Sequence, residues 1–228
     1  MITTNPSITP APVSHHPSPE TLLAYAAGAL SEGVALAIAC HASICRDCRR
    51  ELGRLDAVGG EIMTDVSPAA IGSDALDRVL ARLDEPAPAA PVAPPLDRET
   101  RSLVPRPLQR YLGGSLRALP WHHVGRMFEE VRLPLSGTRV KATLMRIKPG
   151  QIMPRHSHGG LEYTLVLAGG YQDNGVAFGR GDFSELDSND EHQPVADPDG
   201  ECLCLVVLDA PVRLSGFVGR LINPFLRV

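Results

Sequence analysis

The stretch Gly150-Gln-Ile-Met-Pro-Arg-His156-Ser-His158-Gly-Gly-Leu-Glu162 decides the fold of the second half of this 228-residue chain. Two histidines one residue apart on a strand point to the same face, because side chains alternate with period two. Glu162 can return to that face after the glycine turn, and His192 is expected to join it from a neighbouring strand. Three imidazoles and a carboxylate suit zinc, iron, manganese, nickel or copper. The stretch therefore predicts a metal site built on strands.

The sequence around this stretch is typical of an all-β domain. Apolar segments at 140–147, 161–167 and 202–208 are separated by Gly/Pro pairs, and Asp173-Asn174-Gly175 is a strong hairpin signal. Cys202 and Cys204 share one face of the last segment and are expected to be small buried core residues. Many short strands without intervening helices predict a closed sandwich or barrel.

A second cluster of soft ligands, His41-Ala-Ser-Ile-Cys45-Arg-Asp-Cys48, lies in the first half of the chain. Positions i, i+4 and i+7 share a narrow stripe of a helix, which would supply three of the four ligands of a tetrahedral zinc site. If Ser43 instead caps a new helix, both thiols lie in its first turn, which also permits metal binding. The alternative is that all three are ordinary buried residues.

A closed structural site needs a fourth ligand. The nearest free donors are His15 and His16, just before a helix start at Ser18-Pro19-Glu20. We favour His16 because it is closer to the anchored helix, although the sequence barely separates it from His15. Cys40 points away from His41 on a helix and is expected to pack in the core.

Four short helices are predicted in residues 1–84: 21–27, 31–41, about 45–63, and one capped by Ser73 with apolar residues at Leu76, Val79, Leu80 and Leu83. They predict a small all-α four-helix bundle that is stabilised by a bound zinc ion. Residues 85–100 contain five prolines between Pro86 and Pro95 and form a Pro/Ala-rich linker, reaching about 30 Å at roughly 3.1 Å per residue. Residues 101–228 form the β domain, so the predicted fold class is α+β with two domains.

Composition excludes several classes of protein. The net charge is −4, and residues 1–84 carry the whole excess, with six Arg against ten Asp and Glu. Phosphate binding needs clustered Lys and Arg, so direct nucleic-acid binding is not expected. The first ten residues lack a signal-peptide pattern, and no apolar run approaches the roughly 18 residues of a membrane span. Five cysteines with ligand-like spacings suit a reducing compartment, which predicts a cytoplasmic protein.

The chain resembles the ChrR-type zinc-binding anti-sigma factors, which join a zinc anti-sigma domain to a C-terminal cupin domain. The cluster at 41–48 with its upstream histidine matches the H-x3-C-x2-C motif of the first domain, and 22–32 and 55–60 also look close to these proteins. The first cupin motif, G-x5-H-x-H-x3-E-x6-G, matches at every defined position of residues 150–169. The second motif is degraded. Gly181 and His192 keep their separation, but Asp187, Asn189 and Ala196 replace its Pro, Gly and Asn.

The resemblance, which covers about residues 15–220, implies a cupin barrel (double-stranded β-helix) and two Zn²⁺ ions per chain. It implies that His16, His41, Cys45 and Cys48 hold one zinc ion and that His156, His158, Glu162 and His192 hold the other. It also implies a non-enzymatic protein that sequesters a group IV (ECF-type) sigma factor and is released by singlet oxygen or organic hydroperoxide.

Two alternatives remain at this point. The first is a metal-dependent cupin enzyme, a dioxygenase or isomerase, with an N-terminal zinc module, because a four-ligand site can support chemistry. The second is a zinc module that binds nucleic acid, against which the acidic charge of residues 1–84 counts.

Overall fold

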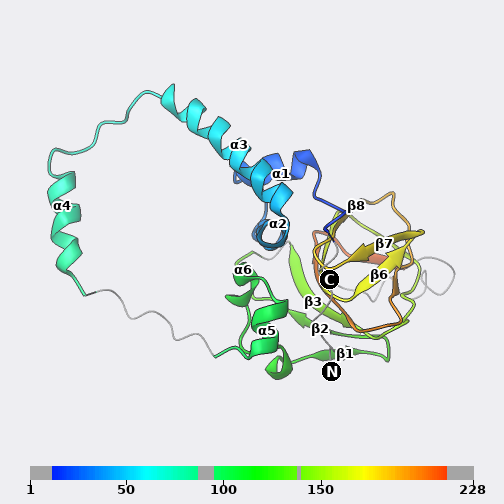
Figure 1. Cartoon of the computed structure of the whole chain (residues 1–228). Helices are drawn as coiled ribbons and strands as arrows, with labels where there is room; N and C mark the ends of the chain where they lie inside the picture. Colours follow the sequence, from blue (N-terminus) through cyan, green and yellow to red (C-terminus); the bar gives the residue numbers. More distant parts are fainter. Residues whose placement is uncertain (1–11, 87–94, 138–139, 215–228) are drawn as a thin grey trace.

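The computed structural model describes residues 12–86, 95–137 and 140–214, in which helices come first and antiparallel strands follow (Figure 1). The helices are α1 (Pro19–Ala26), α2 (Glu32–Ile44), α3 (Arg46–Thr64), α4 (Ala75–Ala81), η1 (Arg82–Asp84), α5 (Arg98–Leu103), α6 (Arg106–Gln109) and η2 (Leu116–Ala118). None of these helices is long and apolar enough to cross a bilayer. Residues 87–94, the centre of the predicted linker, lie outside the described residues.

The strands build the C-terminal part of the chain. They are β1 (His122–Val124), β2 (Phe128–Arg132), β3 (Lys141–Ile147), β4 (His156–His158), β5 (Glu162–Ala168), β6 (Gly170–Asp173), β7 (Val176–Gly179), β8 (Phe183–Leu186), β9 (Val195–Ala196), β10 (Cys202–Leu208) and β11 (Val212–Leu214). They form a six-stranded sheet in the order β1-β2-β3-β10-β5-β8, a three-stranded sheet β7-β6-β9 and the pair β11-β4. The central strands β5 and β10 lie in the apolar segments that the sequence indicated, and both are buried on both faces.

The predicted closed barrel is not confirmed. The described strands belong to three separate antiparallel sheets, and the pair β11-β4 is joined to the region of β9 by the isolated bridges Ile152↔Val195 and His156↔His192. Short strands such as β4 and β9 leave gaps in the hydrogen-bond ladder, which explains why the sheets are not continuous.

The N-terminal helices pack directly on the β domain. Helix α2 lies against β5, β10 and α6, and one continuous hydrophobic core runs from Ile38 on α2 to Leu144 and Leu205 on the sheet. A Cβ added at Gly33 would lie 3.0 Å from Leu135 Cδ1 and 3.2 Å from Val207 Cγ1, so a larger residue there would require these side chains to shift by a few tenths of an ångström. The boundaries 1–84, 85–100 and 101–228 stay a prediction, but the helices and the sheet share their core.

The predicted four-helix bundle differs from the structure at its last helix. Helices α1, α2 and α3 pack together, whereas α4 stands apart from them in Figure 1 and buries none of its residues. Its apolar stripe faces solvent, with Val79 61% and Leu80 49% exposed. Its N-cap is Asp74 rather than the predicted Ser73. An amphipathic pattern predicts that a helix has an apolar face, but it does not say what covers that face.

Candidate metal centres

The ligands of the first cluster lie at the junction of α2 and α3. His41 is on the last turn of α2, Cys45 is the N-cap of α3, and Cys48 is in its first turn. The helix breaks between His41 and Cys48, so the three residues do not share one continuous helical stripe. The structure instead resembles the alternative in which a new helix begins here, with Cys45 rather than Ser43 as its cap. Cys45 Sγ accepts a hydrogen bond from Cys48 N at 3.5 Å.

His16 completes this cluster. Its Nδ1 lies 3.4 Å from both Cys45 Sγ and Cys48 Sγ, and His41 Nε2 lies 3.2 Å from Cys48 Sγ. One ligand atom from each of these four residues lies within 4.8 Å of the other three. His15 turns the other way, toward the β domain, where the centroid of its ring lies 4.5 Å from that of Phe178 with the rings tilted by 37°. The structure thus places His16, not His15, with the cluster.

The chemistry of this donor set fits a metal ion. His41 is fully buried, and its Nδ1–H donates to the carbonyl oxygen of Gly181 at 2.9 Å, so Nε2 presents a lone pair to the sulfurs. Burial lowers the pKa of His41 to about 4. Burial and the neighbouring Cys45 raise the pKa of Cys48 to about 12, so a thiolate there needs a cation beside it. Two sulfurs and two imidazoles in a closed site are the ligands that structural zinc prefers.

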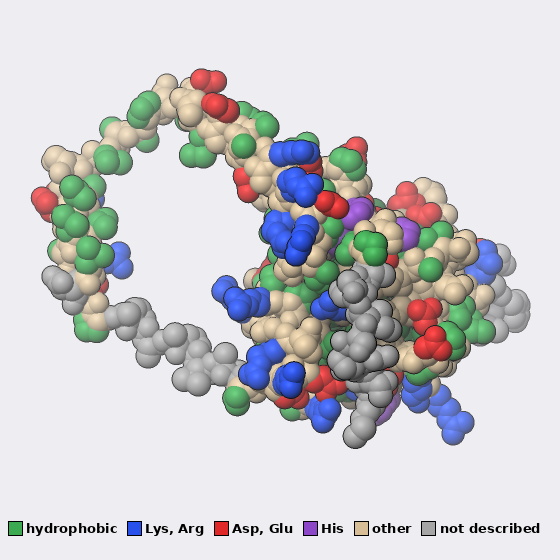
Figure 2. Space-filling view, in the orientation of Figure 1, with side chains coloured by type: hydrophobic (Ala, Val, Ile, Leu, Met, Phe, Trp, Pro, Cys, Tyr) green, Lys and Arg blue, Asp and Glu red, His purple; other side chains and the backbone are tan. Residues whose placement is uncertain are grey.

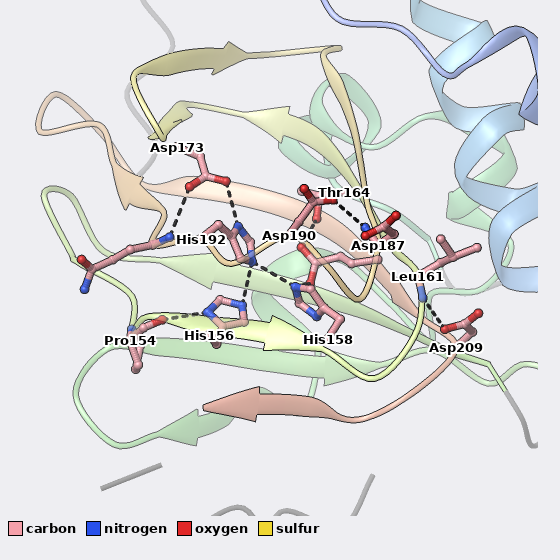
Figure 3. A network of polar contacts seen from close by, with 12 residues as sticks. Pro154, His156, His158, Leu161, Thr164, Asp173, Asp187, Asp190, His192 and Asp209 are labelled. Atoms are coloured by element: carbon pink, nitrogen blue, oxygen red, sulfur yellow. Dashed lines mark hydrogen bonds and ion pairs between the residues drawn. The ribbon is translucent and has the colours of Figure 1, made fainter. Parts of the chain in front are cut away.

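The second cluster lies at one end of the six-stranded sheet and on the strand pair next to it. His156 and His158 are the two ends of β4, Glu162 begins β5, and His192 bridges to His156 from the loop before β9. The Nε2 atoms of His156 and His158 each lie 3.0 Å from Nε2 of His192. Glu162 Oε2 is 3.4 Å from His158 Nε2. Figure 3 shows the three rings pointing toward one another, and all four ligand atoms lie within 4.8 Å of each other.

Outer hydrogen bonds orient two of these rings. His156 Nδ1–H donates to Pro154 O at 2.7 Å, and His192 Nδ1–H donates to Asp173 Oδ2 at 2.8 Å (Figure 3). When both rings are neutral, their Nε2 lone pairs face each other and repel, and a cation bound between them removes this repulsion. A carboxylate behind a ligating imidazole also increases its basicity. The donors thus fit a metal ion, and Asp173 is a supporting residue that the sequence marked only as part of a hairpin turn.

Burial controls the protonation of this cluster. It lowers the pKa of His158 to about 4 and also lowers the pKa of His156. For His192, burial opposes protonation, but the hydrogen bond to Asp173 and the charge of Glu162 outweigh it and raise the pKa. Burial raises the pKa of Glu162. Neutral imidazoles are the form that binds a metal ion, so the lowered pKa values of His156 and His158 favour metal over protons at these two rings.

A cavity of about 490 Å³ opens onto the second cluster. His156, Glu162 and His192 line its floor, and its walls are mostly apolar side chains of β2, β3 and β10, such as Phe128, Met145 and Val206. A small apolar molecule could reach the ligands from this side. The first cluster, by contrast, has three of its four ligands buried.

Cys202 and Cys204 are buried core residues, as predicted. They are 0% and 2% exposed, both thiols are free, and their Sγ atoms lie 3.4 Å apart. The contact with Cys202 and burial raise the pKa of Cys204, which makes its thiolate unfavourable.

Comparisons with known proteins agree with this arrangement. Residues 113–211 match the family model of the ChrR cupin-like domain. The chain is 40% identical over 220 residues to the anti-sigma-E factor ChrR of Cereibacter sphaeroides, covering 95% of this chain and 99% of that protein. It also resembles the crystal structure of Rhodobacter sphaeroides SigE in complex with the anti-sigma ChrR, with a TM-score of 0.75 and 39% identity over 86% of this chain and 99% of that one. The chain therefore belongs to the ChrR family of anti-sigma factors.

Proposed function

We propose that this protein is a cytoplasmic anti-sigma factor that sequesters an ECF-type sigma factor through its N-terminal domain. In this proposal transcription stays blocked until an oxidative signal, singlet oxygen or an organic hydroperoxide, acts through the cupin domain. The observation that carries the proposal is the similarity to ChrR along nearly its whole length, together with the structure of ChrR bound to SigE.

An exposed apolar surface on the N-terminal domain supports this proposal. Nine of the exposed large hydrophobic residues lie in the segment that runs from α3 through η1: Val58, Ile62, Met63, Val66, Ile71, Leu76, Val79, Leu80 and Leu83. Figure 2 shows green side chains along this arm, away from the packed body of the molecule. We call these nine residues the arm surface. A concentration of exposed apolar side chains of this kind marks a protein interaction site, and here a sigma factor would cover it.

The cupin cavity supports the sensing role. A signal molecule must reach the metal ligands, and the cavity leads to His156, Glu162 and His192. Ligands contributed by separate strands link a change at the metal to the geometry of the sheet.

Co-purification tests the proposal. The tagged full-length chain, expressed with the ECF sigma factor encoded in the same operon, is expected to retain that sigma factor. Leu80→Asp should weaken capture about tenfold or more, because it places a charge in the apolar interface. Val176→Asp is the matched control, since Val176 is an exposed apolar residue on the β domain, 43% exposed. Failure of the parent chain to retain the sigma factor, or equal capture by both variants, would contradict the proposal.

We also propose that both clusters bind zinc, one ion in each domain. Elemental analysis of full-length protein purified without added metal is expected to give two zinc ions per chain. Cys45→Ser should lower the content by one ion, and His158→Ala should lower it by one ion from the other site. A reproducible ratio of one, or iron at full occupancy in the His3Glu site, would overturn this expectation.

The cavity also favours a second candidate, a metal-dependent cupin enzyme. A metal reached by small molecules can support a dioxygenase or isomerase reaction. Turnover of a cavity ligand that is lost in Glu162→Ala, in a chain that captures no sigma factor, would favour this candidate.

A further inference from the structure

The turn between β7 and β8 touches the N-terminal metal cluster from outside. Gly181 O accepts the hydrogen bond from His41 Nδ1–H at 2.9 Å, across 140 residues of sequence. The Phe183 ring, just after the turn, lies 5.6 Å from the His41 ring in an edge arrangement. The cupin domain therefore supplies a hydrogen bond and a ring contact that orient the imidazole of one candidate zinc ligand.

Glycine is required at position 181. Its φ is +95°, a conformation that residues with a Cβ rarely adopt. An added Cβ would lie 2.7 Å from Val13 Cγ2 and 2.9 Å from Ile44 Cγ2. Ile44 ends α2 and directly precedes Cys45, so any side chain at 181 would push against the junction that carries the cluster.

Asp182 fixes the segment that leads to His16. Its Oδ1 accepts hydrogen bonds from Ser14 N at 2.7 Å and His15 N at 2.9 Å, and its Oδ2 accepts one from Gly179 N at 2.8 Å. Burial alone would raise the pKa of Asp182, but these backbone N–H groups outweigh it and lower the pKa. A nearly buried carboxylate thus ties two backbone groups just before His16 to the turn.

The same segment is also held through its backbone carbonyl. Phe183 N donates to His15 O at 3.0 Å. Residue 15 is thereby fixed on both its N–H and its C=O, which limits where the next residue, His16, can point.

Strand β5 holds the turn in place. Gly181 N donates to Val166 O at 2.8 Å, Val166 N donates to Asp182 O at 3.1 Å, and Arg180 Nε donates to Leu167 O at 3.0 Å. These hydrogen bonds fix the turn to the buried strand β5, so it is not a free loop. It supplies a fixed surface against which the N-terminal ligands are positioned.

We propose that the turn 180–182 of the cupin domain is the outer support of the N-terminal metal site. It positions His41 through the Gly181 carbonyl. It positions His16 through the hydrogen bonds that Asp182 accepts from the backbone of Ser14 and His15. Retention of the N-terminal metal therefore depends on contact between the domains. This inference rests on metal binding by the His2Cys2 cluster, which is part of the proposed function, but it does not depend on binding of a sigma factor. Outer partners of ligating histidines typically change metal affinity 10- to 100-fold.

Cobalt substitution of the full-length chain tests this support. Thiolate-to-cobalt charge-transfer absorption reports only the His2Cys2 site, because the His3Glu set contains no sulfur. When excess EDTA is added to remove the cobalt, we expect this absorption to decay at least tenfold faster in Gly181→Ala than in the parent. Gly175→Ala is the matched control. Gly175 also has positive φ, +82°, but a Cβ there meets no atom within 4 Å. It should lose cobalt at the parent rate.

A series at Asp182 covers the case in which Gly181→Ala fails to fold. Asp182→Ala removes the acceptor for Ser14 and His15 N–H and should speed cobalt loss about tenfold. Asp182→Asn keeps an Oδ1 acceptor and should restore much of the retention, which a general packing defect would not show. Parent-like rates in both Asp182→Ala and a folded Gly181→Ala would overturn the proposal, and so would equal acceleration by Gly175→Ala. No sigma factor takes part, so this result is separable from failure of the anti-sigma proposal.

Discussion

Replacing Cys48 with alanine is expected to abolish inhibition, raising transcription from a sigma-dependent reporter to the level of a strain that lacks the chain. Cys48 Sγ lies 3.2 Å from His41 Nε2 and 3.4 Å from His16 Nδ1, so it is central to the cluster. Structural zinc supplies about 10–16 kcal/mol of apparent binding free energy in small zinc-binding peptides. The core that α2 shares with the sheet does not replace that contribution at the α2–α3 junction, where the cluster lies. Loss of this ligand should disorder the α2–α3 junction. The position of α3, which carries the first residues of the arm surface, should then no longer be fixed.

The matched control for this prediction is Cys40→Ala. Cys40 is also a buried cysteine of α2, 0% exposed, but it lies outside the metal cluster. Its replacement by alanine leaves only a small cavity, which should lower the free energy of unfolding by about 1 kcal/mol and leave the reporter repressed. Zinc content, measured on both variants, should fall by one ion in Cys48→Ala alone. Full repression by a zinc-depleted Cys48→Ala would show that the first site does not maintain the inhibitory shape.

The parts of the fold that follow from local chemistry were predictable. Ser18 caps α1, where its Oγ accepts from Thr21 N at 3.2 Å, and Gly28 follows the helix with φ +67°. Asn174 and Gly175 both have positive φ, as the hairpin signal requires. The two clusters were also predictable, because ligand types at fixed spacings restrict the possible geometries. All eight residues predicted as ligands meet in the two clusters, although their metal ions remain proposals.

The contacts between distant segments could not be predicted. The sequence indicated only that Asp173 belongs to a hairpin turn, although its carboxylate accepts a hydrogen bond from His192, 19 residues away. Gly181 was visible only as the start of a degraded cupin motif, although its carbonyl supports His41. Each contact depends on which sheet edge faces which helix, and residue spacing carries no signal for that. Likewise, the stripe on α4 indicated an apolar face, while the structure leaves that face exposed.

Truncation of a cupin ligand is expected to have the opposite effect to loss of Cys48. Glu162→Ala should keep the reporter repressed before stress but reduce its induction by singlet oxygen or organic hydroperoxide to a small fraction of the parent response. The substitution removes a carboxylate from the floor of the cavity and leaves the β5 backbone, which holds the turn at Gly181, unchanged. The support of the N-terminal site, and hence inhibition, should therefore persist while the metal that responds to the signal is lost.

Glu130→Ala is the matched control for this last prediction, because Glu130 lines the same cavity but lies outside the metal cluster. The measurement is a sigma-dependent reporter in cells carrying each variant, with and without stress, together with capture of the sigma factor by the purified chain. Glu130→Ala should respond like the parent if the metal, rather than the charge of the cavity, carries the signal. High activity of Glu162→Ala before any stress would show that the cupin site itself takes part in inhibition. Normal induction in a chain whose cupin site has lost its metal would show that sensing does not use that metal.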